Sequence, residues 1–145
     1  MEFRHIPVML DECIDGLDIK PDGVYLDCTL GGGGHSEKIV SQLQGGKLIA
    51  VDKDIEAIKS SQARLSEYKD KIIYIHDDFK NVISHLDEMG VEKLDGVLID
   101  LGVSSYQLDN AERGFSYNAD APLDMRMDQG QYLSAKQVVN EYSQE

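Results

Sequence analysis

The stretch that decides the fold is residues 24–36, which read VYLDCTLGGGGHS. Its first residues are mostly apolar and rich in strand formers, and the turn signal Pro21-Asp22-Gly23 precedes them. Four consecutive glycines follow, and apolar residues then recur with helical spacing over residues 35–43. The stretch therefore predicts a strand, a glycine loop and a helix in direct succession.

The same alternation of strand and helix continues along the chain. Further strands are predicted over residues 48–51, 72–75 and 96–99, and helices over residues 8–17, 54–65, 79–89 and 134–142. The central helices are expected to bury Ile39, Val40, Leu43, Ile55, Ile58, Leu65, Val82, Ile83, Leu86 and Met89. Apolar strands joined by helices indicate a parallel sheet covered on both faces. We expect an α/β fold with a Rossmann-like, partial doubly wound sheet of strand order 3-2-1-4.

The composition limits the partners of the chain. Its 145 residues include 27 Asp and Glu against 14 Lys and Arg, so the formal net charge is −13. This charge disfavours proteins that hold nucleic acid or anionic membranes by bulk electrostatics. No apolar run approaches the roughly 20 residues of a membrane span, and no signal peptide opens the chain, so a cytoplasmic protein is expected. The cysteines and histidines lack metal-ligand spacing, and no metal is predicted.

The glycine loop predicts a ligand site, because glycines let a ligand approach the backbone and the amides that open the next helix face polar ligand atoms. The dinucleotide pattern G-x-G-x-x-G, counted from Gly31, requires glycine at the position of Ser36. The pattern D-x-T-x-G-x-G from Asp27 instead favours S-adenosylmethionine (SAM). Two roles are open for Asp27: it receives the ammonium of SAM, or it holds the loop through backbone amides.

Acidic residues also follow the other predicted strands. Asp52 ends the second strand, where a carboxylate accepts the ribose hydroxyls of an adenosine, and Asp54 is expected to cap the next helix. After the third strand, Asp77 or Asp78 either reaches the adenine amine or caps a helix. Phe79 is expected to form a wall against adenine, with a place in the core as the alternative. Since the carboxyl ends of parallel strands share one sheet edge, these residues should line one crevice.

Asp100 follows the fourth strand, where enzymes that methylate amino groups place an acidic or amide residue facing the target nitrogen. The exocyclic amine of cytosine is a poor nucleophile, because its lone pair is delocalised into the ring. A carboxylate that accepts a hydrogen bond from this amine would favour a pyramidal nitrogen while the pocket aligns it with the methyl group. No covalent nucleophile is required.

Five segments carry a family resemblance: residues 5–10 (HIPVML), 27–36 (DCTLGGGGHS), 100–105 (DLGVSS), 113–116 (RGFS) and 122–128 (PLDMRMD). With these motifs the chain resembles the bacterial 16S rRNA (cytosine-N4)-methyltransferase family over nearly its whole length. The resemblance implies the Rossmann-like fold of SAM-dependent methyltransferases. It also implies methyl transfer from SAM to N4 of a cytidine in the decoding region of 16S rRNA.

Carried over residue by residue, the resemblance implies that Asp100 is catalytic. The implied cofactor-binding residues are Gly33, Gly34, His35, Asp52, Phe79, Asp100 and Gln107. Tyr106 stands where the family usually has proline, directly before Gln107.

Members of that family are much longer, so the chain resembles an N-terminal portion. We expect a SAM-binding core over residues 1–108, followed over residues 109–145 by a loop and the start of a helical substrate-recognition insertion. The fourth strand would then lie at a sheet edge, which favours pairing with a second copy, or disorder beyond about residue 104. Arg113 and Arg126 meet RNA phosphate or pair with nearby acids, and the acidic surroundings favour internal pairing.

Two alternatives belong to other classes of function. A non-catalytic nucleotide-binding or interaction module would fit the acidic composition. An NAD-dependent oxidoreductase would use the same sheet, but Ser36 and the motif that begins at Asp100 disfavour it.

Overall fold

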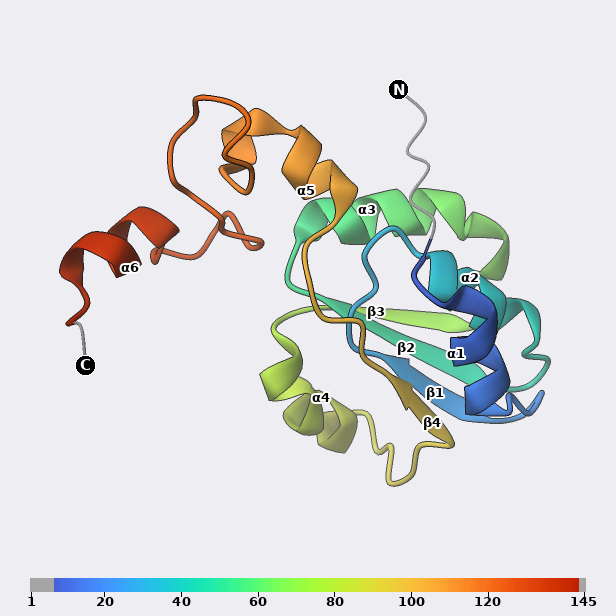
Figure 1. The fold of residues 1–145 in the computed structure, drawn as a ribbon. Helices are drawn as coiled ribbons and strands as arrows, with labels where there is room; N and C mark the ends of the chain where they lie inside the picture. The colour runs from blue at the N-terminus through green and yellow to red at the C-terminus, as the bar shows by residue number, and fades with distance from the viewer. Residues whose placement is uncertain (1–6, 144–145) are drawn as a thin grey trace. The chain divides into compact units, whose positions relative to one another are not determined.

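The computed structural model describes residues 7–143 and contains a parallel four-stranded sheet (Figure 1). Its strands are β1 (Val24–Asp27), β2 (Lys47–Asp52), β3 (Ile72–His76) and β4 (Gly96–Leu98). Their order is β3-β2-β1-β4, and each neighbouring pair is parallel. The predicted fold class and the 3-2-1-4 order are therefore confirmed.

The helices follow the predicted alternation closely. They are α1 (Leu10–Leu17), α2 (Gly34–Ser41), α3 (Ile55–Arg64), α4 (Val82–Glu88), α5 (Ser105–Asp109) and α6 (Ala135–Glu141), with 3-10 turns at η1 (Ser66–Tyr68), η2 (Phe79–Asn81) and η3 (Ala111–Arg113). The segment predicted as one helix over 79–89 begins as a 3-10 turn. Helix α5 was not predicted; its signal is the capping box of Ser104 and Gln107.

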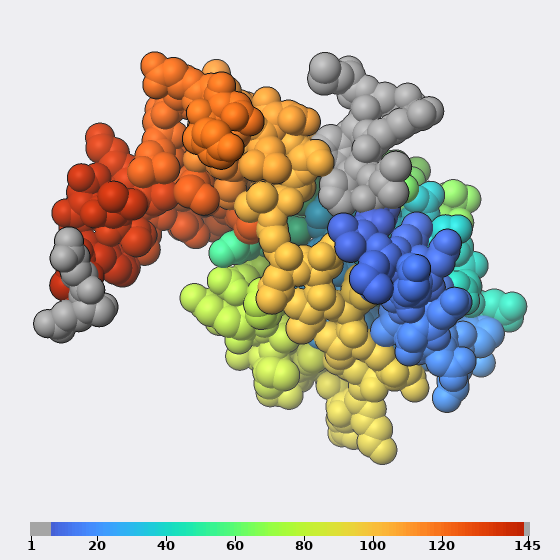
Figure 2. Space-filling model, in the orientation of Figure 1, coloured from blue at the N-terminus to red at the C-terminus, as the bar shows by residue number. Residues whose placement is uncertain are grey.

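Two apolar clusters lie on opposite faces of the sheet. One combines strand residues such as Tyr25 and Leu48 with Ile39 and Val40 of α2 and Ile58 of α3, and partly buried side chains of α1 pack against it. The other cluster joins further strand residues to Val82 and Leu86 of α4. Figure 1 shows α4 on one side of the sheet and α2 and α3 on the other. Helix α1, dark blue in Figure 2, lies at the surface and has no buried residue.

Helical cover is incomplete at β4. Val97 is 47% exposed whereas Leu98 is buried, so one face of this strand is open to solvent. The expectation that helices cover both faces is therefore wrong at β4. Val97 pairs with Leu26 of β1. The cluster under α4 contains Leu26 and residues of β2 and β3, but no residue of β4.

Three residues expected inside are instead exposed: Ile55, Ile83 and Met89. In α4 only Val82 and Leu86, one turn apart, face the sheet, and Ile83 next to Val82 points away from it. Ile55 occupies the first position of α3, ahead of the buried Ile58. Helical spacing identified the apolar residues but overestimated the width of the buried stripe.

The described residues form two compact units, which divide between Leu101 and Gly102. In the second unit, Arg126 makes a bidentate pair with Asp124, with Nε–Oδ1 at 2.7 Å and Nη2–Oδ2 at 2.9 Å. Arg113 is buried and donates from Nη2 to the carbonyls of Arg126 and Met127 at 3.2 and 3.1 Å. Internal pairing is thus confirmed for Arg126. The functional division expected after residue 108 stays a prediction.

Candidate functional site

The glycine loop between β1 and α2 adopts a conformation that requires glycine. Gly31 and Gly33 have φ angles of 51° and 79°, in the left-handed region that L-residues avoid. A Cβ atom at Gly33 would lie 2.9 Å from Oγ of Ser61, so α3 packs directly against the loop. Glycine is therefore needed at position 33 both for the positive φ and for the close packing of α3.

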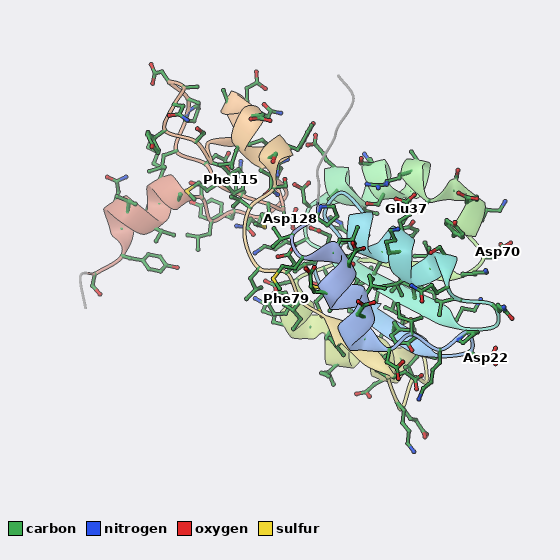
Figure 3. The ribbon with its side chains drawn as sticks, turned by 45° about the vertical axis from the view of Figure 1, so that its right-hand side comes forward. Asp22, Glu37, Asp70, Phe79, Phe115 and Asp128 are labelled. Atoms are coloured by element: carbon green, nitrogen blue, oxygen red, sulfur yellow. The ribbon has the colours of Figure 1, made fainter. Side chains whose placement is uncertain are left out.

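Side chains of β2 and α3 fix the loop from outside. The amide of Gly31 donates to Oδ2 of Asp52 at 2.9 Å, and Ser61 Oγ donates to the carbonyl of Gly31 at 3.0 Å. Arg64 Nη1 donates to the carbonyl of Gly32 at 3.1 Å. Its Nε also bonds Glu37 of α2 at 2.9 Å, and Glu37 is labelled in Figure 3. The loop is therefore held in one shape.

Asp27 is completely buried beneath the loop. Its Oδ2 accepts from Oγ of Ser36 at 2.7 Å, and its Oδ1 accepts from the amide of Thr29 at 3.0 Å. Burial raises the pKa of this carboxyl, while the two hydrogen bonds oppose the rise. Two roles were left open for Asp27, and these contacts show that it holds the loop.

Asp52 ends β2 beside the glycine loop and is half-buried. Its Oδ1 accepts from the amide of Asp54 at 2.8 Å, and its Oδ2 accepts from Gly31. The amide of Lys53 also acts on this carboxylate. A carboxylate offers about four acceptor positions, so these amides leave capacity for a ligand donor. Burial is the largest influence on the pKa of Asp52 and raises it. Asp54 caps α3 as predicted, accepting from the amide of Glu56 at 3.0 Å.

Of the residues that follow β3, one caps the next turn and another exposes its aromatic ring. Asp78 caps η2 by accepting from the amide of Lys80 at 3.1 Å. Asp77 accepts from Asn81 Nδ2 at 2.9 Å and bonds His85 Nε2 at 2.7 Å, and the contact with His85 lowers its pKa to about 2. Phe79, labelled in Figure 3, is 39% exposed, so the alternative core position is excluded and its ring is open to a ligand.

Asp100 lies two residues beyond β4 with its side chain exposed. Its amide donates to Oγ1 of Thr29 at 2.7 Å, and the amide of Cys28 donates to the carbonyl of Leu98 at 2.9 Å. These two bonds tie the start of the loop after β1 to the chain that leaves β4. Asp52, through its side chain, and Asp100, through its backbone amide, are therefore both hydrogen-bonded to the loop segment 28–31. The shared crevice expected for these acids stays a prediction.

His35 and Gly34 contact the segment that precedes α1. The His35 ring is buried, and its Nε2 lies 3.0 Å from the carbonyl of Val8. A Cβ atom at Gly34 would lie 2.1 Å from Cγ of Pro7. Pro7 and Val8 of the HIPVML motif thus contact the start of α2, whereas residues 5 and 6 of the motif lie outside the described residues. The side chain of His35 is used inside the protein, which leaves its amide as the group for a ligand.

Gln107 belongs to the unit that begins at Gly102. It is buried, and its Oε1 accepts from the amide of Ser104 at 3.1 Å within the capping box of α5. Its contact with a cofactor stays a prediction. Within residues 7–143, no group of three or more His, Cys, Asp or Glu side chains is placed to hold a metal ion.

Sequence reasoning did not single out the parts played by Thr29, Ser36, Ser61 and Arg64. One signal for Ser61 exists: it lies between Ile58 and Leu65 at helical spacing, so a polar residue occupies the apolar face of α3. Such a residue requires a buried partner, and the carbonyl of Gly31 supplies it.

The sequence profile of the MraW methylase family matches residues 2–145. The chain belongs to the MraW methylase family. The resemblance stated from its motifs is thereby confirmed.

Curated relatives in this family carry an rRNA methyltransferase name. The chain is 58% identical over 146 residues to the ribosomal RNA small subunit methyltransferase H of Clostridium botulinum, covering 100% of this chain and 47% of that protein. It is 54% identical over 145 residues to the protein of the same name from Finegoldia magna, covering 100% of this chain and 46% of the relative. The chain thus spans about half the length of the curated relatives it matches.

Solved structures show the same fold at low sequence identity. An rRNA methylase from Streptococcus thermophilus superposes with a TM-score of 0.55 at 22% identity, covering 68% of this chain and 58% of that one. This likeness supports the methyltransferase type of α/β fold for this member of the MraW methylase family.

Proposed function

We propose that this chain is the SAM-binding part of a methylase that transfers a methyl group to N4 of a cytidine in the decoding region of 16S rRNA. The observation that carries the proposal is the hydrogen bond between the amide of Gly31 and Asp52. It joins a rigid glycine loop to a carboxylate that keeps free acceptor positions at the end of β2, where ribose hydroxyls are recognised in folds of this type. The names of the long relatives support the rRNA substrate.

The residues around the loop suit the parts of SAM. Asp52 would accept the ribose hydroxyls, and the exposed ring of Phe79 would pack against adenine. The amides of Gly34 and His35 open α2 and would face the polar methionine end. The amide of Gly33 already donates to the carbonyl of Leu30 at 2.9 Å, so Gly33 would contribute by letting the ligand approach the loop closely. For Gln107 the proposed cofactor contact rests on the family resemblance alone.

Asp100 is the proposed catalytic residue. Bound SAM supplies an electrophilic methyl group on a positively charged sulfur. The Asp100 carboxylate would accept a hydrogen bond from the cytosine amine, which directs the nitrogen lone pair toward that methyl group. The new bond is N4–C, the bond that breaks is C–S, and the sulfur keeps the electron pair. The proton released from N4 is then held at the Asp100 carboxylate.

The rRNA itself requires more cationic surface than this chain carries. Its net charge of −13 gives little attraction for phosphate. We propose that the main RNA-binding surface of the relatives lies in the part of their sequence that this chain does not match. A ribosomal RNA substrate would favour a cytoplasmic location. Within residues 7–143 no helix has the length and apolar character needed to cross a bilayer.

The exposed edge and open face of β4 favour pairing with a second copy, because unpaired strand edges and exposed apolar side chains such as Val97 attract further strands. A dimer is expected in light scattering over a range of protein concentrations. A monomer at all concentrations would remove this part of the proposal and leave the cofactor site untouched.

Calorimetry with SAM, S-adenosylhomocysteine and NAD tests the proposed function. We expect both SAM and S-adenosylhomocysteine to bind and NAD not to bind. Tighter binding of NAD than of SAM would make the oxidoreductase the better interpretation. Binding of an adenine nucleotide without SAM would favour the non-catalytic module instead.

A further inference from the structure

The hydroxyl of Thr29 connects the glycine loop to the proposed catalytic acid. The amide of Asp100 donates to Thr29 Oγ1 at 2.7 Å, although the two residues are 71 positions apart in sequence. Strand β4 ends at Leu98, so the backbone of Asp100 lies beyond the last pairing of the sheet. This hydrogen bond therefore holds the backbone of an exposed acid at a point where the strand ladder no longer does.

Thr29 is itself fixed from below. Its amide donates to Asp27, whose other carboxylate oxygen accepts from Ser36 at the start of α2. A fully buried carboxylate is costly unless its oxygens accept hydrogen bonds, and here both do. Because threonine is β-branched, its χ1 is also restricted, so a fixed backbone aims the hydroxyl.

We propose that Thr29 is a positioning residue: its hydroxyl holds Asp100 at a set place relative to the loop that binds the cofactor. The inference rests on the proposed function and extends it, because it names the contact that fixes the position of Asp100 relative to the methyl donor. A small displacement of an acid that directs a nucleophile has a large effect on transfer, since alignment of the reacting atoms lowers the barrier.

Two substitutions separate this role from general support of the fold. Thr29→Val keeps the shape of the side chain and removes the hydroxyl, whereas Thr29→Ser keeps the hydroxyl and removes the methyl group. In the wild-type chain and both variants we would measure the hydrogen-exchange rate of the Asp100 amide by NMR, the affinity for SAM by calorimetry, and the urea midpoint. Thr29→Ala adds no bulk and carries the test if the valine variant does not fold.

In Thr29→Val we expect the Asp100 amide to exchange roughly fivefold to tenfold faster, the size of effect expected from one lost hydrogen bond. The affinity for SAM should fall by a similar factor, and Thr29→Ser should restore both quantities. An unchanged exchange rate in Thr29→Val, or a serine variant as impaired as the valine variant, would overturn the proposal. So would faster exchange with unchanged affinity for SAM.

The exchange measurement separates this inference from the proposed function. If the wild-type chain does not bind SAM, the proposed function fails, and the Asp100 exchange rates still decide whether Thr29 holds that residue. If SAM binds and the Asp100 amide is indifferent to the hydroxyl, the proposed function stands and Thr29 is only a loop residue.

Discussion

At the scale of single residues, two carboxylates of the same loop region have different surroundings and different uses. Asp27 is buried, and its two oxygens accept hydrogen bonds from Ser36 and Thr29. Asp52 is half-buried, and each of its oxygens accepts a hydrogen bond from a backbone amide. Residue type and spacing place an acid after each strand, but they do not reveal how deeply each acid lies. Burial closes Asp27 off from solvent, so of the two carboxylates only that of Asp52 is accessible from outside.

Removing the Asp52 carboxylate should weaken SAM binding. Asp52→Ala deletes the two proposed hydrogen bonds to ribose, which are charge-assisted, so the cost should be about 1.5–3 kcal/mol, or roughly 10- to 150-fold in Kd. Calorimetry measures this change directly. Asp87→Ala, an equal loss of charge at an exposed site on α4, is the control and should leave the affinity as it is. Equal affinities for SAM in both variants would mean that the ribose is held elsewhere.

At the scale of elements, the strand and helix boundaries were predictable because apolar runs and glycines mark them. The width of a helix's buried face was harder to predict. In α4, Val82 and Leu86 are buried and Ile83 is exposed, because the neighbouring elements determine how much of a helix is covered. The ties between elements had no sequence signal of their own. The bond from His35 to the carbonyl of Val8 joins residues 27 positions apart, and only the folded chain brings them together.

This bond should hold the start of the chain on the glycine loop. His35→Phe fills a similar space without a ring nitrogen, so the amides of α1 that follow Val8, including that of Cys13, should exchange faster. Hydrogen exchange with mass spectrometry on peptides of residues 7–17 measures the effect. Peptides of α4 serve as the internal reference and should be unaffected. Unchanged protection of α1 would show that Pro7 packing on Gly34 is sufficient by itself.

The turn before α4 carries a pH-dependent contact. His85 bonds Asp77 and is the main reason that the pKa of Asp77 falls to about 2. A lowered carboxyl pKa gives stability that is present above the ordinary value of 3.8 and is lost as the pH falls toward 2. In His85→Ala the Asp77 pKa should return toward 3.8, as followed by NMR of its carboxyl carbon.

The two proteins should accordingly differ in stability at pH 5, and the difference should shrink as the pH falls from about 4 toward 2, because Asp77 becomes protonated in both. Urea unfolding at the two pH values checks this sign. If the stability difference instead grew as the pH fell, the contact with His85 would not be the cause of the lowered pKa.

At the scale of the whole molecule, the negative net charge disfavours RNA as a partner, whereas the proposed function requires it. The curated relatives are named ribosomal RNA methyltransferases, yet in this chain acidic residues outnumber basic ones by 27 to 14. Within the second unit, Arg126 is paired with Asp124, and Arg113 is buried against backbone carbonyls. The sequence predicted internal pairing from the local excess of acids, and the structure shows why these arginines contribute little to an RNA-binding surface.

This chain should therefore bind SAM and yet bind RNA weakly. Protein contacts to phosphate release counterions, which gives a slope of log K against log salt of about −0.7 per contact for single strands and about −0.9 for duplexes. With a labelled RNA hairpin from the decoding region, fluorescence anisotropy should show weak binding with a slope near zero. Poly-aspartate competition serves as the control for charge alone. Tight binding with a steep salt slope would show that a cationic RNA surface is formed within this chain after all, despite its net charge of −13.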